Sequence, residues 1–192
     1  MDLDTEDGRT MFSSKLAEEV FGAETEFKAV QFHLHAGSEH TIDGIRHDLE
    51  LHTVHFPDKV TKGFIAAAVG VMFSVDDYNR NVTEAESLII DSFFQSLRWD
   101  DLETNPTVDL VTYGALMEMV DTNNRWVYKG SVTTPVCATF VYWNVLSTIY
   151  PVKAKHLQQF QEQLNRGENG RLDEFGNWRE IQEIDYHDVI YI

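Results

Sequence analysis

The chain reads Gln-Phe-His-Leu-His at residues 31–35 and Glu-Leu-His-Thr-Val at residues 50–54. Polar and apolar residues alternate through both stretches, which is the period of a β-strand. Because alternate residues of a strand point to the same face, His33 and His35 project together from the first stretch. If the second strand lies beside the first in one sheet, His52 joins them. The pattern therefore predicts three imidazoles that converge on one point.

Three neutral histidines suit a catalytic zinc ion, which accepts nitrogen ligands in a tetrahedron and keeps one position for a reactive water. A ligating imidazole also needs its second ring nitrogen fixed by an amide, a carboxylate or a carbonyl. Gln31 and Glu50 each stand two residues from a proposed ligand, and we expect them in this role. The alternative is a polar sheet face without metal, which an isolated His-x-His often is. The additional Glu-x-His on the second strand favours the metal.

The rest of the chain predicts a strand-dominated α+β fold with one core, since 43% of its 192 residues are hydrophobic. We expect a single domain over residues 1–192, with a central, largely antiparallel twisted sheet and a few peripheral helices. Asp43-Gly44 predicts a hairpin turn, and Thr83 begins a capping-box pattern with Glu86. The expected strands are 27–35, 48–56, 63–75, 125–131, 139–148 and 179–184, and the expected helices are 15–21, 83–97 and 153–166.

Composition limits the partners. A formal net charge of -17 repels phosphate backbones, so nucleic acid is not an expected partner. The longest apolar run, residues 64–73, is too short to span a membrane, and the acidic N-terminus shows no apolar signal region. Cys137 is the single cysteine, which excludes an internal disulfide and a cysteine-rich zinc site.

Several blocks of sequence, in one order, resemble the α-class carbonic anhydrases from about residue 27 to residue 184. The resemblance implies the α-carbonic anhydrase fold, a zinc cofactor at His33, His35 and His52, and reversible hydration of carbon dioxide to bicarbonate and a proton. In known carbonic anhydrases zinc lowers the pKa of its bound water to about 7, and this value belongs to those enzymes. The matching blocks are Gln31–His35, Ser38–His40, Glu50–His55, Gly130–Pro135, Val141–Trp143 and Asn177–Glu180.

The resemblance also assigns roles around the metal. Thr133 would accept a hydrogen bond from the zinc hydroxide, and Glu39 would hold the Thr133 hydroxyl in place. Thr134 would lie beside the bicarbonate. The apolar wall for carbon dioxide would consist of Val54, Val132, Val141 and Trp143. Without the resemblance, the two threonines would be interpreted as turn residues and the four apolar residues as part of the core. Of the nearby histidines, His40 is left without a role, and His47 and His55 are expected to be structural.

The chain departs from the family pattern at its N-terminus, where it is shorter than the usual catalytic domain. A non-catalytic or weakly active binding domain is therefore the alternative function, and an uncovered apolar surface could lead to a homodimer. Cys137 stands where secreted members carry half of a disulfide, and its usual partner would lie upstream. This position favours a secreted protein or one derived from an exported precursor, and the alternative is that Cys137 serves as a small buried hydrophobic residue.

The missing upstream part normally carries the family's proton-shuttle histidine, and no histidine precedes His33 here. We therefore predict that carbon dioxide hydration rises with the concentration of an imidazole-type buffer, because the buffer must carry the proton away. The measurement is the hydration rate at fixed pH and ionic strength over a range of buffer concentrations. A flat dependence would show that another group moves the proton.

Overall fold

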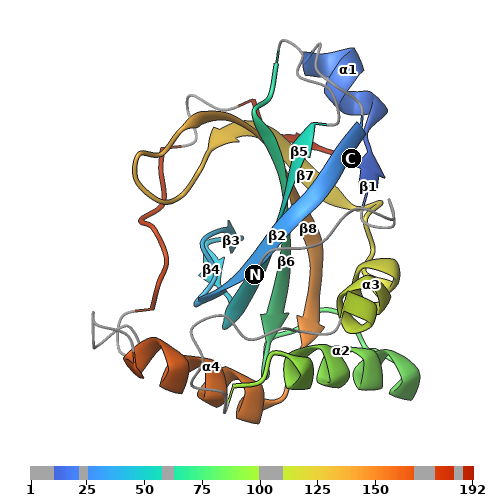
Figure 1. The fold of residues 1–192 in the computed structure, drawn as a ribbon, viewed down its shortest axis with the longest axis vertical. Helices are drawn as coiled ribbons and strands as arrows, with labels where there is room; N and C mark the ends of the chain where they lie inside the picture. The colour runs from blue at the N-terminus through green and yellow to red at the C-terminus, as the bar shows by residue number, and fades with distance from the viewer. Residues whose placement is uncertain (1–10, 22–25, 58–62, 100–109, 167–175, 184–187) are drawn as a thin grey trace.

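The computed structural model describes residues 11–21, 26–57, 63–99, 110–166, 176–183 and 188–192. The described strands are β1 (Met11–Ser13), β2 (Glu26–Ala36), β3 (Thr41–Ile42), β4 (Ile45–Arg46), β5 (Leu49–Pro57), β6 (Ala66–Ser74), β7 (Arg125–Ser131), β8 (Thr139–Pro151) and β9 (Ile190–Tyr191). Seven of them form a twisted sheet in the order β1-β2-β5-β6-β8-β7-β9, and β3 and β4 form a separate hairpin (Figure 1). Strands β6 and β8 run parallel, and the other pairs are antiparallel. The predicted largely antiparallel sheet is confirmed.

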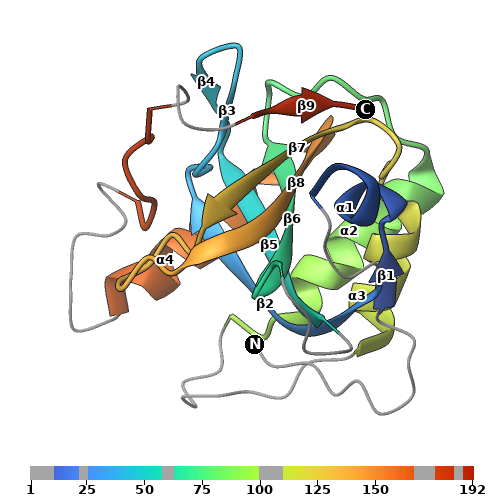
Figure 2. The same cartoon turned by 90° about the horizontal axis from the view of Figure 1, so that it is seen from above.

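The described helices are α1 (Lys15–Phe21), α2 (Glu84–Ser96), α3 (Leu110–Met119) and α4 (Ala154–Arg166). Helix α2 begins with the predicted capping box, in which Thr83 and Glu86 satisfy each other's backbone N–H groups. Helices α2 and α3 lie on one side of the sheet, and the β3–β4 hairpin lies on the other (Figure 2). None of the described helices is both long and apolar enough to span a membrane.

The main core lies between the sheet and the helices. Phe32 and Leu51 from the sheet pack there with Phe93 and Phe94 of α2 and with Leu116 of α3, and all are buried. Burying a side chain of this size stabilises the fold by about 1.5–3 kcal/mol. Because strand residues alternate, the same strands present a second set of side chains to the opposite face. The candidate site is built on that opposite face.

Most predicted elements are confirmed to within a few residues, but one strand is wrong. Residues 179–183 form no strand, and the short strand β9 lies later, at Ile190–Tyr191. The reason lies in contacts of the Arg179 region: its backbone N–H donates to the Glu39 carboxylate, far away in sequence, and its guanidinium contacts Gln182. The segment is therefore held against the hairpin region by side chains.

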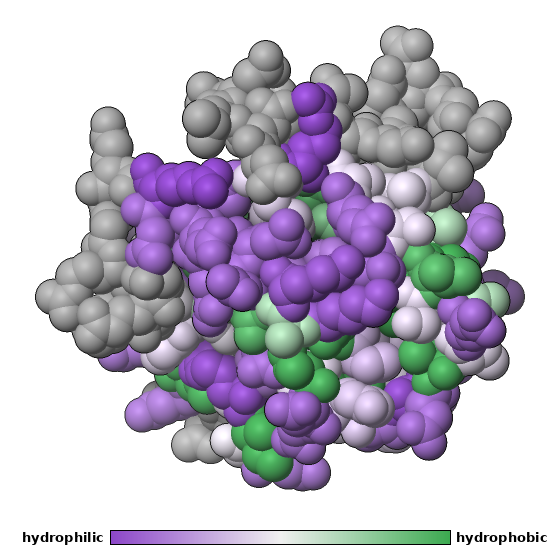
Figure 3. Space-filling model, turned by 90° about the horizontal axis from the view of Figure 1, so that it is seen from below, coloured by the Kyte–Doolittle hydropathy of each residue, from purple (hydrophilic) through white to green (hydrophobic). Residues whose placement is uncertain are grey.

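The face carrying α2 and α4 is mainly hydrophilic, with small hydrophobic patches between the polar side chains (Figure 3). One ion-pair cluster joins the two helices across this face. Asp91 of α2 accepts hydrogen bonds from Lys153 Nζ at 2.7 Å and from His156 Nε2 at 2.5 Å, and Lys155 Nζ lies 3.2 Å away. Burial alone would raise the pKa of Asp91, but these donors outweigh it and hold the pKa well below its usual range.

We predict that Asp91→Asn lowers the free energy of unfolding by about 1–3 kcal/mol at pH 7, because it leaves charged donors without their acceptor. The folded-state pKa of Asp91 is depressed, so its contribution is present above the unfolded pKa of about 4 and is lost as the pH falls. Urea unfolding from pH 7 to pH 3 should show the two proteins converging. Asp76→Asn, at an exposed carboxylate, is the control; an equal loss there would contradict the prediction.

Candidate metal centre

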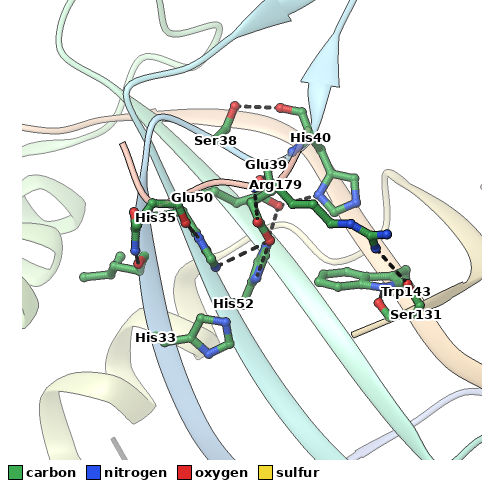
Figure 4. A network of polar contacts seen from close by, with 12 residues as sticks. His33, His35, Ser38, Glu39, His40, Glu50, His52, Ser131, Trp143 and Arg179 are labelled. Atoms are coloured by element: carbon green, nitrogen blue, oxygen red, sulfur yellow. Dashed lines mark hydrogen bonds and ion pairs between the residues drawn. The ribbon is translucent and has the colours of Figure 1, made fainter. Parts of the chain in front are cut away.

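The register of β2 and β5 brings the three predicted histidines together. His33 and His52 are direct cross-strand partners, and His35 lies two residues further along β2 on the same face. The ring centroids of His33 and His35 are 5.1 Å apart, as are those of His33 and His52, and those of His35 and His52 are 4.6 Å apart. One nitrogen of each ring lies within 4.8 Å of the other two. Figure 4 shows the three rings pointing toward one another.

The outer nitrogen of each ring is held by an oxygen atom. His33 Nδ1 lies 2.8 Å from Gln31 Oε1, His35 Nδ1 lies 2.7 Å from the Asn177 carbonyl, and His52 Nε2 lies 2.9 Å from Glu50 Oε1. An oxygen acceptor requires the outer nitrogen to carry the proton, which leaves the lone pair on the inner nitrogen. The inner nitrogens of His35 and His52 are buried and have no hydrogen-bond partner among the described residues. The outer Nε2 atom of His52 faces Glu50 at ion-pair distance, but the contact does not have the geometry of a hydrogen bond.

Such unpartnered buried nitrogens require an explanation, and a metal ion is the one that their chemistry fits. Burial and the neighbouring rings of His52 and His35 lower the pKa of His33 to about 3. Burial, together with His52, also lowers the pKa of His35. Both imidazoles are therefore neutral near pH 7, which is the form that binds a metal.

A buried carboxylate lies directly behind the cluster. Glu50 is fully buried, and it accepts hydrogen bonds from His40, through the ring at 2.7 Å and the backbone N–H at 2.9 Å, while His52 Nε2 lies close to it as described above. Burial would raise the pKa of Glu50, but His40 and His52 hold it well below the usual value. Conversely, burial would lower the pKa of His40, and the Glu50 carboxylate raises it. The Nε2 atom of His40 lies 2.7 Å from the Tyr128 hydroxyl.

Sequence reasoning missed this part of the site. The blocks around His40 and Asn177 were recognised as parts of the resemblance, but neither residue was given a contact. Tyr128 was read simply as part of a strand. A ring nitrogen that contacts a distant backbone carbonyl leaves no local pattern, so only the fold shows the role of Asn177.

Glu39 lies beside two of the histidines, and Thr133 lines the same cavity as Glu39. The Oε1 atom of Glu39 accepts the backbone N–H of Arg179 at 2.7 Å, and its Oε2 atom lies 3.5 Å from His35 Nε2 and 3.8 Å from His52 Nδ1. Both Glu39 and Thr133 line a cavity of about 380 Å³. The described contacts include no hydrogen bond between Thr133 and Glu39, so the pairing expected from the resemblance stays a prediction.

An apolar wall stands next to the histidines. Val141 and Trp143 of β8 are buried and cluster with Ala68 of β6, and Val54 packs against them. The Trp143 ring lies 4.8 Å from the His52 ring, and its Nε1–H donates to the Ser131 carbonyl at 3.0 Å. That bond anchors the start of the following loop, on which Val132 and Thr134 are exposed.

Two further histidines are buried near the site without joining it. His55 is held by a hydrogen bond from its Nδ1 atom to the Thr53 carbonyl, and burial lowers its pKa to about 4. His47 is also buried, and neither ring nitrogen has a hydrogen-bond partner among the described residues. Neither residue belongs to the groups of side chains that could hold a metal.

The fold and the site define a protein with a group of three histidines that could hold a metal ion, on the face of a largely antiparallel sheet. The chain belongs to the carbonic anhydrase family: the model for eukaryotic-type carbonic anhydrase matches residues 3–192.

Known proteins agree with this assignment. Carbonic anhydrase 6 of Canis lupus familiaris is 29% identical over 178 residues, which cover 83% of this chain and 52% of that protein. A carbonic anhydrase of Nostoc is 29% identical over 140 residues, covering 71% and 46%. A hyperthermostable carbonic anhydrase from a hydrothermal vent chimney matches in structure with a TM-score of 0.61 and 26% identity, covering 87% of this chain and 64% of that one. The chain spans about half the length of the sequence relatives.

We predict that the purified protein binds about one zinc ion per chain and that His52→Ala abolishes tight binding, because two nitrogens rarely suffice for a zinc site. Metal removal should lower the melting temperature of the wild type, since a ligand that binds only the folded state stabilises it. Metal content and calorimetry on the same samples are the measurements. His47→Gln is the matched control, a buried histidine outside the cluster; loss of zinc in that variant would contradict the assignment.

Proposed function

We propose that this chain catalyses the reversible hydration of carbon dioxide to bicarbonate and a proton, with zinc held by His33, His35 and His52. The observation that carries the proposal is the convergence of one nitrogen from each ring, while the other nitrogen of each ring faces an oxygen atom. A bound zinc ion supplies a Lewis acid that makes hydroxide available near neutral pH.

The residues around the histidines divide the remaining tasks. Val54, Val141 and Trp143 supply an apolar surface, which suits a small apolar substrate such as carbon dioxide. Such a wall also keeps bulk water from the reacting atoms, and this strengthens every electrostatic interaction inside the site. Val132 extends the wall from the loop, and Thr134 provides a hydroxyl beside it for bicarbonate.

Thr133 and Glu39 are proposed to orient the attacking oxygen. In this arrangement the Thr133 hydroxyl donates a hydrogen bond to the Glu39 carboxylate. The lone pairs of the hydroxyl are then left to accept a hydrogen bond from the reacting hydroxide. The support is their position: both line the same cavity, and one Glu39 oxygen points at the inner nitrogens of His35 and His52. The proposal therefore requires that the Thr133 hydroxyl turns toward Glu39 in the active enzyme.

We predict rapid carbon dioxide hydration by the zinc-loaded wild type in stopped-flow measurements, and none above background for His52→Ala. Thr133→Ala should retain zinc but lose about 10²-fold in turnover, since removing one positioned hydrogen-bonding group from a reaction centre typically has this cost. Thr139→Ala, at an exposed threonine after the same loop, is the matched control and should keep its turnover.

Two results would contradict the proposal in different ways. Bound zinc without hydration in the wild type would indicate a binding domain with an intact metal site. Hydration that survives in His52→Ala would place the chemistry elsewhere.

A further inference from the structure

Gly70 of β6 is placed where the buried carboxylate of Glu50 must pass. In the register, Gly70 is the cross-strand partner of His52, and Glu50 is paired with Met72, the next residue of β6 on that face. The Glu50 side chain therefore extends from the Glu50–Met72 pair toward the backbone of Gly70 in β6. A Cβ atom built on Gly70 would lie 2.5 Å from Glu50 Oε1, closer than carbon and oxygen atoms approach in proteins.

A left-handed backbone conformation does not explain the glycine. Among the described residues, those with positive φ are other ones, such as Gly44 and Gly63. The register of β6 with β8 shifts between Gly70 and Met72, but the pairing of β6 with β5, from which Glu50 comes, is continuous through Gly70. Glycine in the interior of a strand weakens it, and it commonly marks a place where another group approaches closely. The approaching group here is the carboxylate itself.

The carboxylate has no room to move aside at low cost. Glu50 Oε1 lies 2.9 Å from His52 Nε2 and 2.7 Å from His40 Nδ1, and Glu50 is fully buried. A displaced carboxylate would lose these donors while remaining out of water, which is strongly unfavourable. A methyl group at position 70 therefore acts on the orientation of His52 through Glu50.

We infer that Gly70 is a positioning residue for the metal centre: its missing side chain lets Glu50 reach His52 and fix the ring nitrogen that faces the metal. The inference rests on the proposed zinc site and extends it to a residue that touches neither metal nor substrate. It differs from a general packing role because it requires Glu50 to be present.

The test is a double-mutant cycle on zinc affinity, measured by competition with a chelator, with Gly70→Ala, Glu50→Ala and the double variant. Gly70→Ala should weaken zinc binding by about 10–100-fold, the usual effect of losing an outer partner of a metal ligand. In the Glu50→Ala background, the same substitution should change affinity by less than about 2-fold, since no carboxylate remains to be displaced. Gly114→Ala in α3 is the control, because a Cβ there meets nothing within 4 Å.

An unchanged affinity in Gly70→Ala, or an equal loss in both backgrounds, would overturn the inference. If Gly70→Ala does not fold, recovery of folding in the double variant supports the inference, and failure of both overturns it. If the wild type binds no zinc, the proposed function fails separately. The melting temperatures of the metal-free proteins then decide: Gly70→Ala should melt below the wild type, and the double variant should melt no lower than Glu50→Ala.

Discussion

The site depends on the register between β2 and β5. Strand side chains alternate with a period of two, so a slip of one residue would turn His52 to the opposite face of the sheet. The register is held by the apolar half of the same strands, since Phe32 and Leu51 must face the helices to remain buried. The core and the metal centre are therefore two faces of one pairing. A change that loosens the core also disperses the histidines.

The buried charge of Glu50 orients the His52 ring. A carboxylate as fully buried as Glu50 is tolerated only with donors on its oxygens, and these come from His40 and His52. The contact fixes the proton of His52 on its outer nitrogen and leaves a buried lone pair on the inner one. Without a metal, that lone pair has no described partner. The outer nitrogens therefore each face an oxygen atom, and the inner side is the one on which a cation could bind.

The sequence pattern predicted those elements of the fold that depend on interactions between residues close together in the sequence. The alternation around His33 and His52 and the capping box at Thr83 each depend on neighbours in sequence, and the structure contains both elements. Helix α3 has no polar face to reveal its period, and it was missed. The strand expected at 179–184 failed because Arg179 is held by Glu39, a contact between segments far apart in sequence. The roles of His40 and Asn177 were hidden for the same reason.

The geometry also separates a catalytic role from a purely binding one. A structural zinc site is usually closed by four protein ligands, whereas a catalytic site keeps one position open beside its substrate. Three histidines form one of the two described groups that could hold a metal, the other being His40, Glu50 and His52, and the apolar wall of Val141 and Trp143 stands next to them. A domain that only held a metal would gain nothing from a dry wall beside the open side of the centre. The pairing of an incomplete ligand set with that wall therefore favours catalysis, although the chain spans about half the length of its sequence relatives.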